Sequence, residues 1–167
     1  MLYGDAGNDI LNGLAGGDLL LGGLGSDSFV FAPVSSGPLD VIGDFAKGAV
    51  GVGDEIDYSV ALTIGGSAAA ATNTQASINA TTGVATFAAG SGVILDDALT
   101  DIAARFATAT DTAGEFAQFR VNNADNFYMF ISDGAAGVTD DDVVVELIGV
   151  TTIGSINLTG GDLTIWT

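Results

Sequence analysis

The sequence predicts an all-β fold, in which a short parallel β-roll continues into a β-sandwich and one α-helix lies near residues 96–108. Three observations predict this fold. A nine-residue repeat occupies the start of the 167-residue chain, short apolar runs with strand-like patterning recur in its last third, and one stretch has apolar residues at helical spacing. We therefore divide the chain into roll repeats at 1–32 and a C-terminal sandwich at 33–167.

The repeat consists of three consecutive units, GDAGNDILN, GLAGGDLLL and GGLGSDSFV, which begin at Gly4, Gly13 and Gly22. Positions one and four of each unit are Gly, position six is Asp, and position eight is Leu or Phe. The first six residues favour a tight turn, because Gly reaches backbone angles that other residues avoid. The last three favour a short strand whose middle side chain points inward.

Two such units make one coil of a parallel β-helix, so that turns on the same side are two units apart. Asp9 and Asp27 then share one side, and Asp18 lies on the other. Stacked carboxylates repel each other unless a cation lies between them, and carboxylates with turn carbonyls form the oxygen cage that Ca²⁺ accepts. Two units after Asp18 the sequence has Ser36, so we expect a half-built site there. The alternative is a Gly- and Asp-rich loop without metal.

The composition favours cation binding and argues against several other functions. The formal net charge is −18, with Lys47, Arg105 and Arg120 as the only basic residues, which argues against binding nucleic acid or anionic lipid. The chain has no His and no Cys, which removes the Ser-His-Asp triad and most zinc and iron sites. Paired carboxylates could serve glycoside hydrolysis, but Trp166 is the only Trp, and we expect no enzyme.

The ends of the sequence give two further indications. No apolar run is long enough to span a bilayer, and the N-terminus lacks the basic and apolar segments of a secretory signal peptide. The first residues, MLYGD, fall inside a repeat, with Leu2 at position eight of an earlier unit. We therefore interpret the chain as the C-terminal part of a longer protein.

The repeats resemble the RTX family of secreted bacterial proteins, which leave the cell by type I export. The segments SDSFVF, DVIGDF and GDEIDYS resemble the end of the RTX roll, with Asp40, Asp44, Asp54 and Asp57 at its acidic positions. The segment NFYMFISDGAAGVTDDDVVVELIGV resembles the tail of S-layer proteins, adhesins and other cargo of this exporter, and GGDLTIW resembles the terminal motif of such cargo.

The resemblance implies that the C-terminus carries the type I secretion signal and that Ca²⁺ folds the chain outside a Gram-negative cell, in a secreted or cell-surface protein. The implied partners are calcium ions, the export machinery and a second copy of the chain. The candidate calcium ligands, through side chains or turn carbonyls, are Gly4, Asp5, Gly7, Asn8, Asp9, Gly13, Gly16, Asp18, Gly22, Gly25, Asp27, Asp40, Asp44 and Asp57.

Two further parent proteins are compatible with the same module. One is the lattice-forming or anchoring C-terminal part of an S-layer protein or adhesin, which calcium-dependent self-association would distinguish. The other is the tail of a secreted RTX protease or lipase, which a catalytic His or Ser motif upstream would reveal.

The middle of the chain predicts a hairpin and a helix. Residues 75–88, QASINATTGVATFA, predict two short strands around a turn. The helix carries Asp96 as its expected N-cap, and its i, i+4 pair of Asp101 and Arg105 is expected to contribute only tenths of a kcal/mol. Its apolar face, which we expect to cover the sheet, consists of Leu95, Leu99, Ile102 and Phe106.

The last third predicts long strands. Residues 114–132 predict two strands with a turn at 122–125, and residues 142–150 predict another, with Val143, Val145 and Leu147 inward. Asp133 and the acidic run at 140–142 remain open to two interpretations, as further calcium ligands or as turn residues before a strand.

Overall fold

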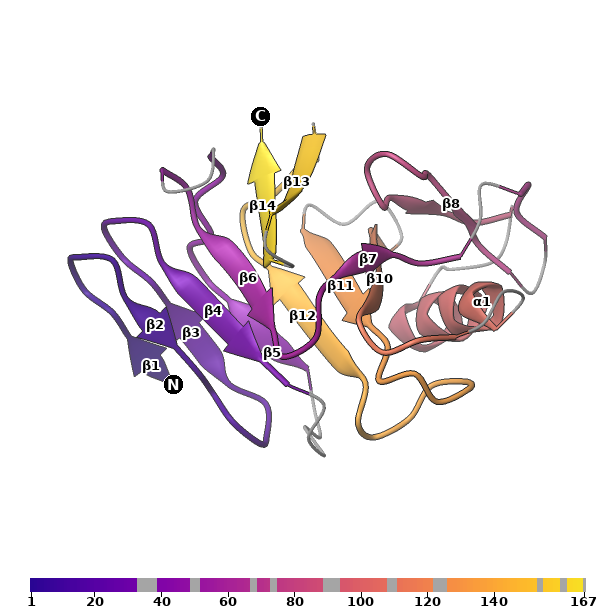
Figure 1. Ribbon diagram of the computed structural model, residues 1–167, viewed down its shortest axis with the longest axis horizontal. Helices are drawn as coiled ribbons and strands as arrows, with labels where there is room; N and C mark the ends of the chain where they lie inside the picture. The colour runs from indigo at the N-terminus through magenta and orange to yellow at the C-terminus, as the bar shows by residue number, and fades with distance from the viewer. Residues whose placement is uncertain are drawn as a thin grey trace.

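The computed structural model describes residues 1–32, 39–48, 52–66, 69–72, 75–88, 94–107, 111–121, 126–152, 155–159 and 162–166. Most strands belong to two sheets, and the one helix of this described part, α1 (Leu95–Phe106), lies at the end remote from the N-terminus (Figure 1). The prediction of an all-β fold with one helix is confirmed. No helix within these ranges is long and apolar enough to cross a membrane.

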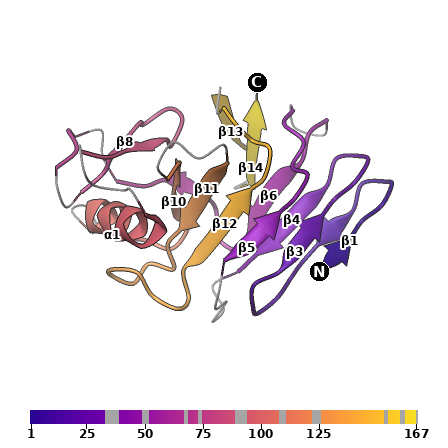
Figure 2. The same ribbon diagram turned by 180° about the vertical axis from the view of Figure 1, so that it is seen from behind.

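Successive N-terminal strands alternate between the two sheets, which is the geometry of a roll (Figures 1 and 2). Neighbouring roll strands are parallel. Leu2 pairs with Leu20 in one sheet and Ile10 pairs with Ser28 in the other, so paired residues are two repeat units apart. The first sheet contains β1 (Leu2–Tyr3), β3 (Leu19–Leu21) and β5 (Asp40–Ile42), and the second contains β2 (Ile10–Leu11), β4 (Ser28–Phe31) and β6 (Glu55–Tyr58).

The same two sheets continue into the sandwich. In the second sheet, β6 pairs antiparallel with β14 (Asp162–Trp166), and β14 pairs with β13 (Ser155–Thr159). The C-terminal strand therefore lies beside the last strand of the roll (Figure 2). A domain boundary after residue 32 stays a prediction. The first sheet extends from β5 through β12 (Val143–Leu147), β11 (Phe127–Ile131), β10 (Glu115–Phe119) and β7 (Thr63–Ile64).

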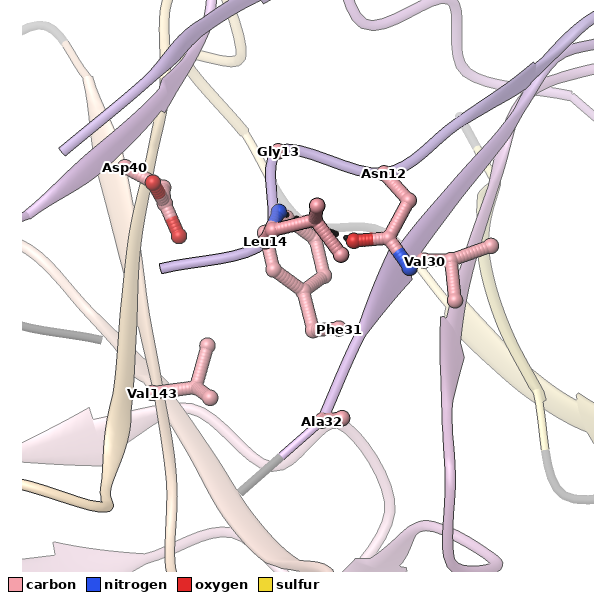
Figure 3. Close-up of a pocket in the computed structure, with 8 residues that line it drawn as sticks. All are labelled: Asn12, Gly13, Leu14, Val30, Phe31, Ala32, Asp40 and Val143. Carbon is pink, nitrogen blue, oxygen red and sulfur yellow. Dashed lines mark hydrogen bonds between the residues drawn. The ribbon is translucent and has the colours of Figure 1, made fainter. Parts of the chain in front are cut away.

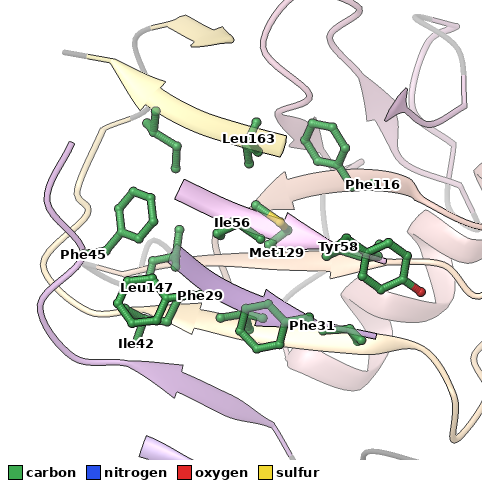
Figure 4. Close-up of a cluster of buried hydrophobic side chains, with 14 of the residues drawn as sticks. Phe29, Phe31, Ile42, Phe45, Ile56, Tyr58, Phe116, Met129, Leu147 and Leu163 are labelled. Atoms are coloured by element: carbon green, nitrogen blue, oxygen red, sulfur yellow. The ribbon is translucent and has the colours of Figure 1, made fainter. Parts of the chain in front are cut away.

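One apolar core fills the space between the two sheets along their shared length. The position-eight residues Leu11, Leu20 and Phe29 are buried in it, as predicted. Figure 4 shows Phe29 beside Leu147 of the sandwich, so that roll and sandwich share this core. The inward residues of β12 are also buried, which confirms their predicted direction: Val143, Val145 and Leu147.

A second apolar cluster lies on the other face of β10 and β11, under α1. Phe106 stacks on Phe130 with ring centroids 5.8 Å apart, and Ile102 is fully buried beside them. The predicted hairpin is confirmed as β8 (Ser77–Ile78) and β9 (Ala85–Thr86), which pair antiparallel and contribute to this cluster.

Two details of α1 differ from the sequence prediction. The N-cap is Ile94, without a side-chain hydrogen bond, and Asp96 lies in the first turn, where the helix dipole favours an acid. Asp101 and Arg105 are 5% and 4% exposed. The few tenths of a kcal/mol expected for an exposed ion pair therefore do not apply to these buried residues. The Arg105 guanidinium donates to the carbonyl of Ala76 and, over 3.0 Å, to that of Ala70. The turn predicted at 122–125 lies outside the described residues.

Candidate calcium site in the stacked turns

The Gly at position one of each unit leaves room for the Asp at position six of the same unit. A Cβ atom at Gly22 would lie 2.2 Å from Oδ2 of Asp27, and one at Gly4 would lie 2.9 Å from Oδ2 of Asp9. At Gly13 the corresponding distance is 3.0 Å. The five-residue spacing from Gly to Asp within each unit is therefore a packing requirement, because each carboxylate rests against a bare Cα.

The turns also require left-handed backbone at two positions of each unit. Position two has a positive φ even where it is not Gly, at 71° for Asp5 and 64° for Leu14. An L-residue with a side chain costs roughly 1–2 kcal/mol in this conformation, so the stacked neighbours hold it in place. Position four also has positive φ and is Gly in every unit, at Gly7, Gly16 and Gly25.

On the side that holds Asp9 and Asp27, the carboxylates form a ladder between coils. Oδ1 of Asp27 accepts the backbone N–H of Asp9 over 2.9 Å, and Oδ1 of Asp54 accepts the N–H of Asp27 over 2.9 Å. Oδ2 of Asp54 accepts the N–H of Ala46 over 2.8 Å. Each Asp thus binds the backbone of the preceding coil, and Asp54 closes the ladder with both oxygens paired.

The opposite side has a shorter ladder. Oδ1 of Asp40 accepts the N–H of Asp18 over 2.9 Å, because β3 and β5 pair with Leu19 opposite Val41. Asp40 therefore takes the place that a regular period would give to Ser36, which lies outside the described residues. The expected register of Asp18 with Ser36 is thereby corrected, whereas the half-built site expected there stays a prediction. Oδ1 of Asp18 also accepts from the terminal amine of Met1 over 3.2 Å.

Two further candidate ligands tie neighbouring turns together. The two oxygens of Asp44 accept the N–H groups of Gly22 and Gly23, each over 3.0 Å. Oδ1 of Asn8 accepts the N–H of Ser26 over 3.1 Å. Both side chains therefore stabilise the stacking of one turn on the next.

The remaining acidic candidates, Asp5 and Asp57, lie outside the ladders. The side chain of Asp5 is exposed, and its backbone carbonyl accepts the N–H of Leu24 over 2.9 Å. Asp57 alternates with the inward residues of β6, on the same face as Glu55. It lies opposite Asp162 of β14, whose pKa is raised by burial and by Asp57. The structure therefore separates Asp57 from the stacked turns.

The first ladder contains two carboxylate oxygens that lack a partner. Oδ2 of Asp9 and Oδ2 of Asp27 are buried and have no hydrogen bond within the described part of the chain. Asp27 as a whole is 1% exposed. A buried charge without a partner is costly, so the geometry calls for a positive ligand between these coils.

Negative charge accumulates along both ladders. Burial raises the pKa of Asp40, and the charge of Asp18 raises it further, against the lowering effect of their backbone hydrogen bond. Burial also raises the pKa of Asp54, and the charges of Asp27 and Asp44 add to that shift. A divalent cation would offset both the burial of these carboxylates and the repulsion between them.

The donor set fits Ca²⁺. No group of three or more Asp, Glu, His or Cys side chains within the described ranges is close enough to hold a metal. An ion held by Asp9 and Asp27 would therefore take its other ligands from turn carbonyls and water, a mixed oxygen shell that Ca²⁺ accepts. A turn carbonyl is close at hand, since a Cβ at Gly4 would lie 2.5 Å from the carbonyl oxygen of Gly22 and 2.9 Å from Oδ2 of Asp9.

A small pocket opens beside Asp40 on the second side of the roll (Figure 3). The Asp40 carboxylate is directed into it, and Oδ1 of Asn12 is held by the N–H of Leu14 over 2.9 Å. The rest of the wall is mostly apolar, so the pocket offers one acid and we assign it no separate ligand. Its lining consists of Asn12, Gly13, Leu14, Val30, Phe31, Ala32, Asp40 and Val143.

Sequence reasoning did not place Asp54 among the candidate ligands, although it closes the first ladder. A local signal could have found it. Asp9, Asp18 and Asp27 each come directly before a roll strand, and Asp54 comes directly before β6. Asp54 departs from the nine-residue period because residues are inserted before it. These residues lengthen the coil, but the Asp still comes directly before its strand.

Comparison with known proteins agrees with this geometry. Residues 1–29 match the family model described as the RTX calcium-binding nonapeptide repeat (4 copies). No curated protein matches the chain. The matched residues include Asp9, Asp18 and Asp27, the three position-six carboxylates of the ladders. RTX nonapeptide repeats bind Ca²⁺, and residues 1–29 of this chain form an RTX calcium-binding region.

Proposed function

We propose that this chain is the C-terminal module of a larger secreted bacterial protein, that Ca²⁺ folds it outside the cell, and that its C-terminus carries the type I secretion signal. The observation that carries the proposal is the pair of buried, unpartnered Oδ2 atoms of Asp9 and Asp27. Extracellular calcium modules have dissociation constants of about 10⁻⁴–10⁻³ M, so a site of this kind fills outside the cell and stays empty in the cytosol.

Calcium contributes to folding because the site exists only when coils are stacked. Asp9 and Asp27 come from different coils, and the ion can bridge them only in the folded chain. An ion that binds only the folded state stabilises it by about 2.7 kcal/mol at a concentration 100-fold above its dissociation constant. The net charge of −18 works in the opposite direction, since self-repulsion favours the open chain until cations bind.

The position of the C-terminal strand supports export before folding. Leu163 and Ile165 of β14 are fully buried, and Leu163 pairs with Ile56 of the roll strand β6. A secretion signal on β14 could therefore be read only while the chain is unfolded. In this proposal the module supplies folding and export, and any catalysis belongs to the parent protein.

A calcium titration followed by far-UV circular dichroism tests the folding part. We expect a cooperative gain of β signal near millimolar Ca²⁺, reversal by chelator and no comparable gain with Mg²⁺. A roll that is already folded in chelator would contradict calcium-triggered folding and would leave the repeats as a local metal clip.

Asp27→Asn tests the ligand assignment, because Asn retains the Oδ1 acceptor for the N–H of Asp9 and replaces the unpaired Oδ2. We expect the calcium concentration at the folding midpoint to rise about tenfold or more, as when groups of a metal site are removed. Asp97→Asn, an exposed acid in the first turn of α1, is the matched control. Equal midpoints for the two variants would refute the assignment.

An export assay tests the signal. A reporter fused before residue 1 should leave a Gram-negative cell that carries a type I exporter, and removal of residues 160–167 should abolish its export. The control fusion carries Asp27→Asn, which alters folding and leaves the C-terminus intact, and it should still be exported. Undiminished export of the truncated fusion would place the signal elsewhere.

A lattice-forming parent is the second candidate function, favoured by exposed apolar side chains along the roll. Ile10, Leu14 and Leu24 are each more than two-thirds exposed, so apolar side chains are available for contact on both sides of the roll. Sedimentation velocity in calcium and in chelator tests it. Calcium-dependent association that Ile10→Ser reduces would support the candidate, and a monomer in both conditions would exclude it for this module.

A further inference from the structure

The third turn of the roll, residues 22–27, lies between the first turn, residues 4–9, and the segment that leads from β5 to β6. The strand before the third turn pairs with β1 and β5, and the strand after it pairs with β2 and β6. The two unpartnered Oδ2 atoms belong to the first and third turns, so the candidate calcium site lies between these turns. The other side of the third turn rests on Asp44 and Asp54, which we call the cap carboxylates.

Asp44 orients a peptide group whose carbonyl faces the candidate site. Its Oδ1 accepts the N–H of Gly22 and its Oδ2 accepts the N–H of Gly23, each over 3.0 Å. The N–H of Gly23 and the carbonyl of Gly22 belong to one trans peptide unit, so they point in opposite directions. On the site side, a Cβ at Gly4 would lie 2.5 Å from that carbonyl oxygen and 2.9 Å from Oδ2 of Asp9. Asp44 therefore holds, from behind, a carbonyl that lies beside an unpartnered carboxylate oxygen.

Asp54 fixes the backbone of a candidate ligand in the same way. Its Oδ1 accepts the N–H of Asp27 over 2.9 Å, and its Oδ2 accepts the N–H of Ala46 over 2.8 Å. The N–H of Asp54 in turn donates to the carbonyl of Ala46 over 2.8 Å. Asp27 keeps a buried Oδ2 without a partner in the described part of the chain, whereas both oxygens of Asp54 accept backbone N–H groups. Asp54 therefore continues the ladder in position but does not need an ion.

The segment that carries the cap carboxylates is anchored in the sandwich. Phe45 is 7% exposed and belongs to the core between the sheets, with its ring centroid 6.1 Å from that of Phe29. The N–H of Gly48 donates over 2.9 Å to the carbonyl of Ile165 in β14. Apolar packing and a strand of the sandwich therefore place the cap carboxylates, and neither contact requires a metal ion.

We propose that Asp44 and Asp54 are positioning residues of the calcium site between the first and third turns. The cap carboxylates hold the carbonyl of Gly22 and the backbone of Asp27 in place for the ion, and they do not bind it. The affinity of a calcium site depends on how rigidly its oxygens are held, and a carboxylate that accepts an N–H also polarises the carbonyl of that peptide unit. This role rests on the calcium binding proposed above for Asp9 and Asp27.

Europium luminescence on the full chain distinguishes a ligand from a positioning residue. Eu³⁺ replaces Ca²⁺, and the wavelength of its narrow excitation line depends on how many carboxylates bind it. Asp27→Asn removes a ligand charge, so it should shift this line. Asp54→Asn loses the bond from Ala46, so it should weaken Eu³⁺ binding about tenfold and leave the line in place. Asp44→Asn should have the same effect, and because Asp44 is only partly buried this variant should remain folded.

Asp97→Asn is the matched control, since it removes the same charge from an exposed position of α1, and it should change neither the line nor the affinity. A line shift in Asp44→Asn or Asp54→Asn equal to that in Asp27→Asn would identify a ligand and overturn the positioning role. Unchanged affinity in both cap variants would overturn it as well. A line that stays in place in Asp27→Asn would instead refute the calcium site itself, so the two failures are distinguishable.

Discussion

The roll end and the helix-covered end of the molecule are stabilised by different forces. At the roll end, backbone N–H groups of one coil are held by carboxylates of the next, and Oδ2 of Asp27 remains buried without a partner. At the other end, α1 and the β8–β9 hairpin pack on Phe119 and Phe130 of the sheet. Burial of carboxylates therefore calls for an ion, whereas apolar packing is sufficient where Phe and Ile are buried.

The largest expected effect separates the two ends directly. In chelator, hydrogen exchange should be fast at the backbone N–H groups of Asp9 and Asp27 and slow in α1, because only the roll depends on an ion. Calcium should restore protection in the roll. Equal loss of protection at both ends would show that the two ends unfold as a single cooperative unit.

Phe106→Ala tests the helix-covered end. Phe106 is fully buried and stacks on Phe130, so the free energy of unfolding should fall by about 3–5 kcal/mol. Chemical denaturation in saturating calcium measures the loss, with Thr100→Ala on the exposed face of α1 as the control. The calcium midpoint of the roll should not move. A large shift in that midpoint would show that the two ends are coupled.

Gly22→Ala tests the packing of carboxylate on bare Cα in the roll. The new methyl group would lie 2.2 Å from Oδ2 of Asp27, and such overpacking costs about 1–3 kcal/mol. Because the methyl group displaces a candidate ligand, the calcium midpoint should rise as well. Gly149→Ala has no neighbour within 4 Å and should change stability through its positive φ alone, with the midpoint unchanged.

The smallest expected effect is the pH dependence of the calcium-free chain. Burial raises the pKa of Asp142 to about 6, and it also raises the pKa values of Asp40 and Asp54. The folded state then binds more protons than the unfolded state between the ordinary Asp value of 3.8 and about 6. Stability should therefore be greatest below this window and fall as pH rises through it.

Thermal unfolding in chelator at several pH values measures this slope. Asp142→Asn should flatten it, because the titrating group is gone, and Asp97→Asn should leave it unchanged. A melting temperature that rises steadily from pH 4 to pH 7 would contradict the sign of the effect.

The sequence predicted those parts of the fold that repeat. The roll followed from one period of nine, because position-one Gly and position-six Asp are in contact within each unit, as at Gly22 and Asp27. The helix followed from spacing, since Ile102 and Phe106 face the same apolar cluster. In both cases the physical cause is local, so a short stretch of sequence is enough to predict the structure.

The parts that sequence could not predict depend on contacts between distant segments. The partnership of Asp18 with Asp40 arises because inserted residues lengthen one coil before its strand pairs. Arg105 is buried because the segment that contains Ala70 and Ala76 lies against α1. Neither insertion length nor the position of a distant segment is encoded in a periodic pattern.

The place of β14 beside β6 has a consequence for the timing of folding. The second sheet joins β4, from the start of the chain, to β14, from its end, through β6. Contacts between strands so distant in sequence form slowly, because the loop between them must close first. Until the last strand arrives, one edge of β6 has no strand paired to it, and such an edge can pair with another chain. The time for which the edge of β6 stays unpaired is therefore set by the arrival of β14, the last strand of the chain.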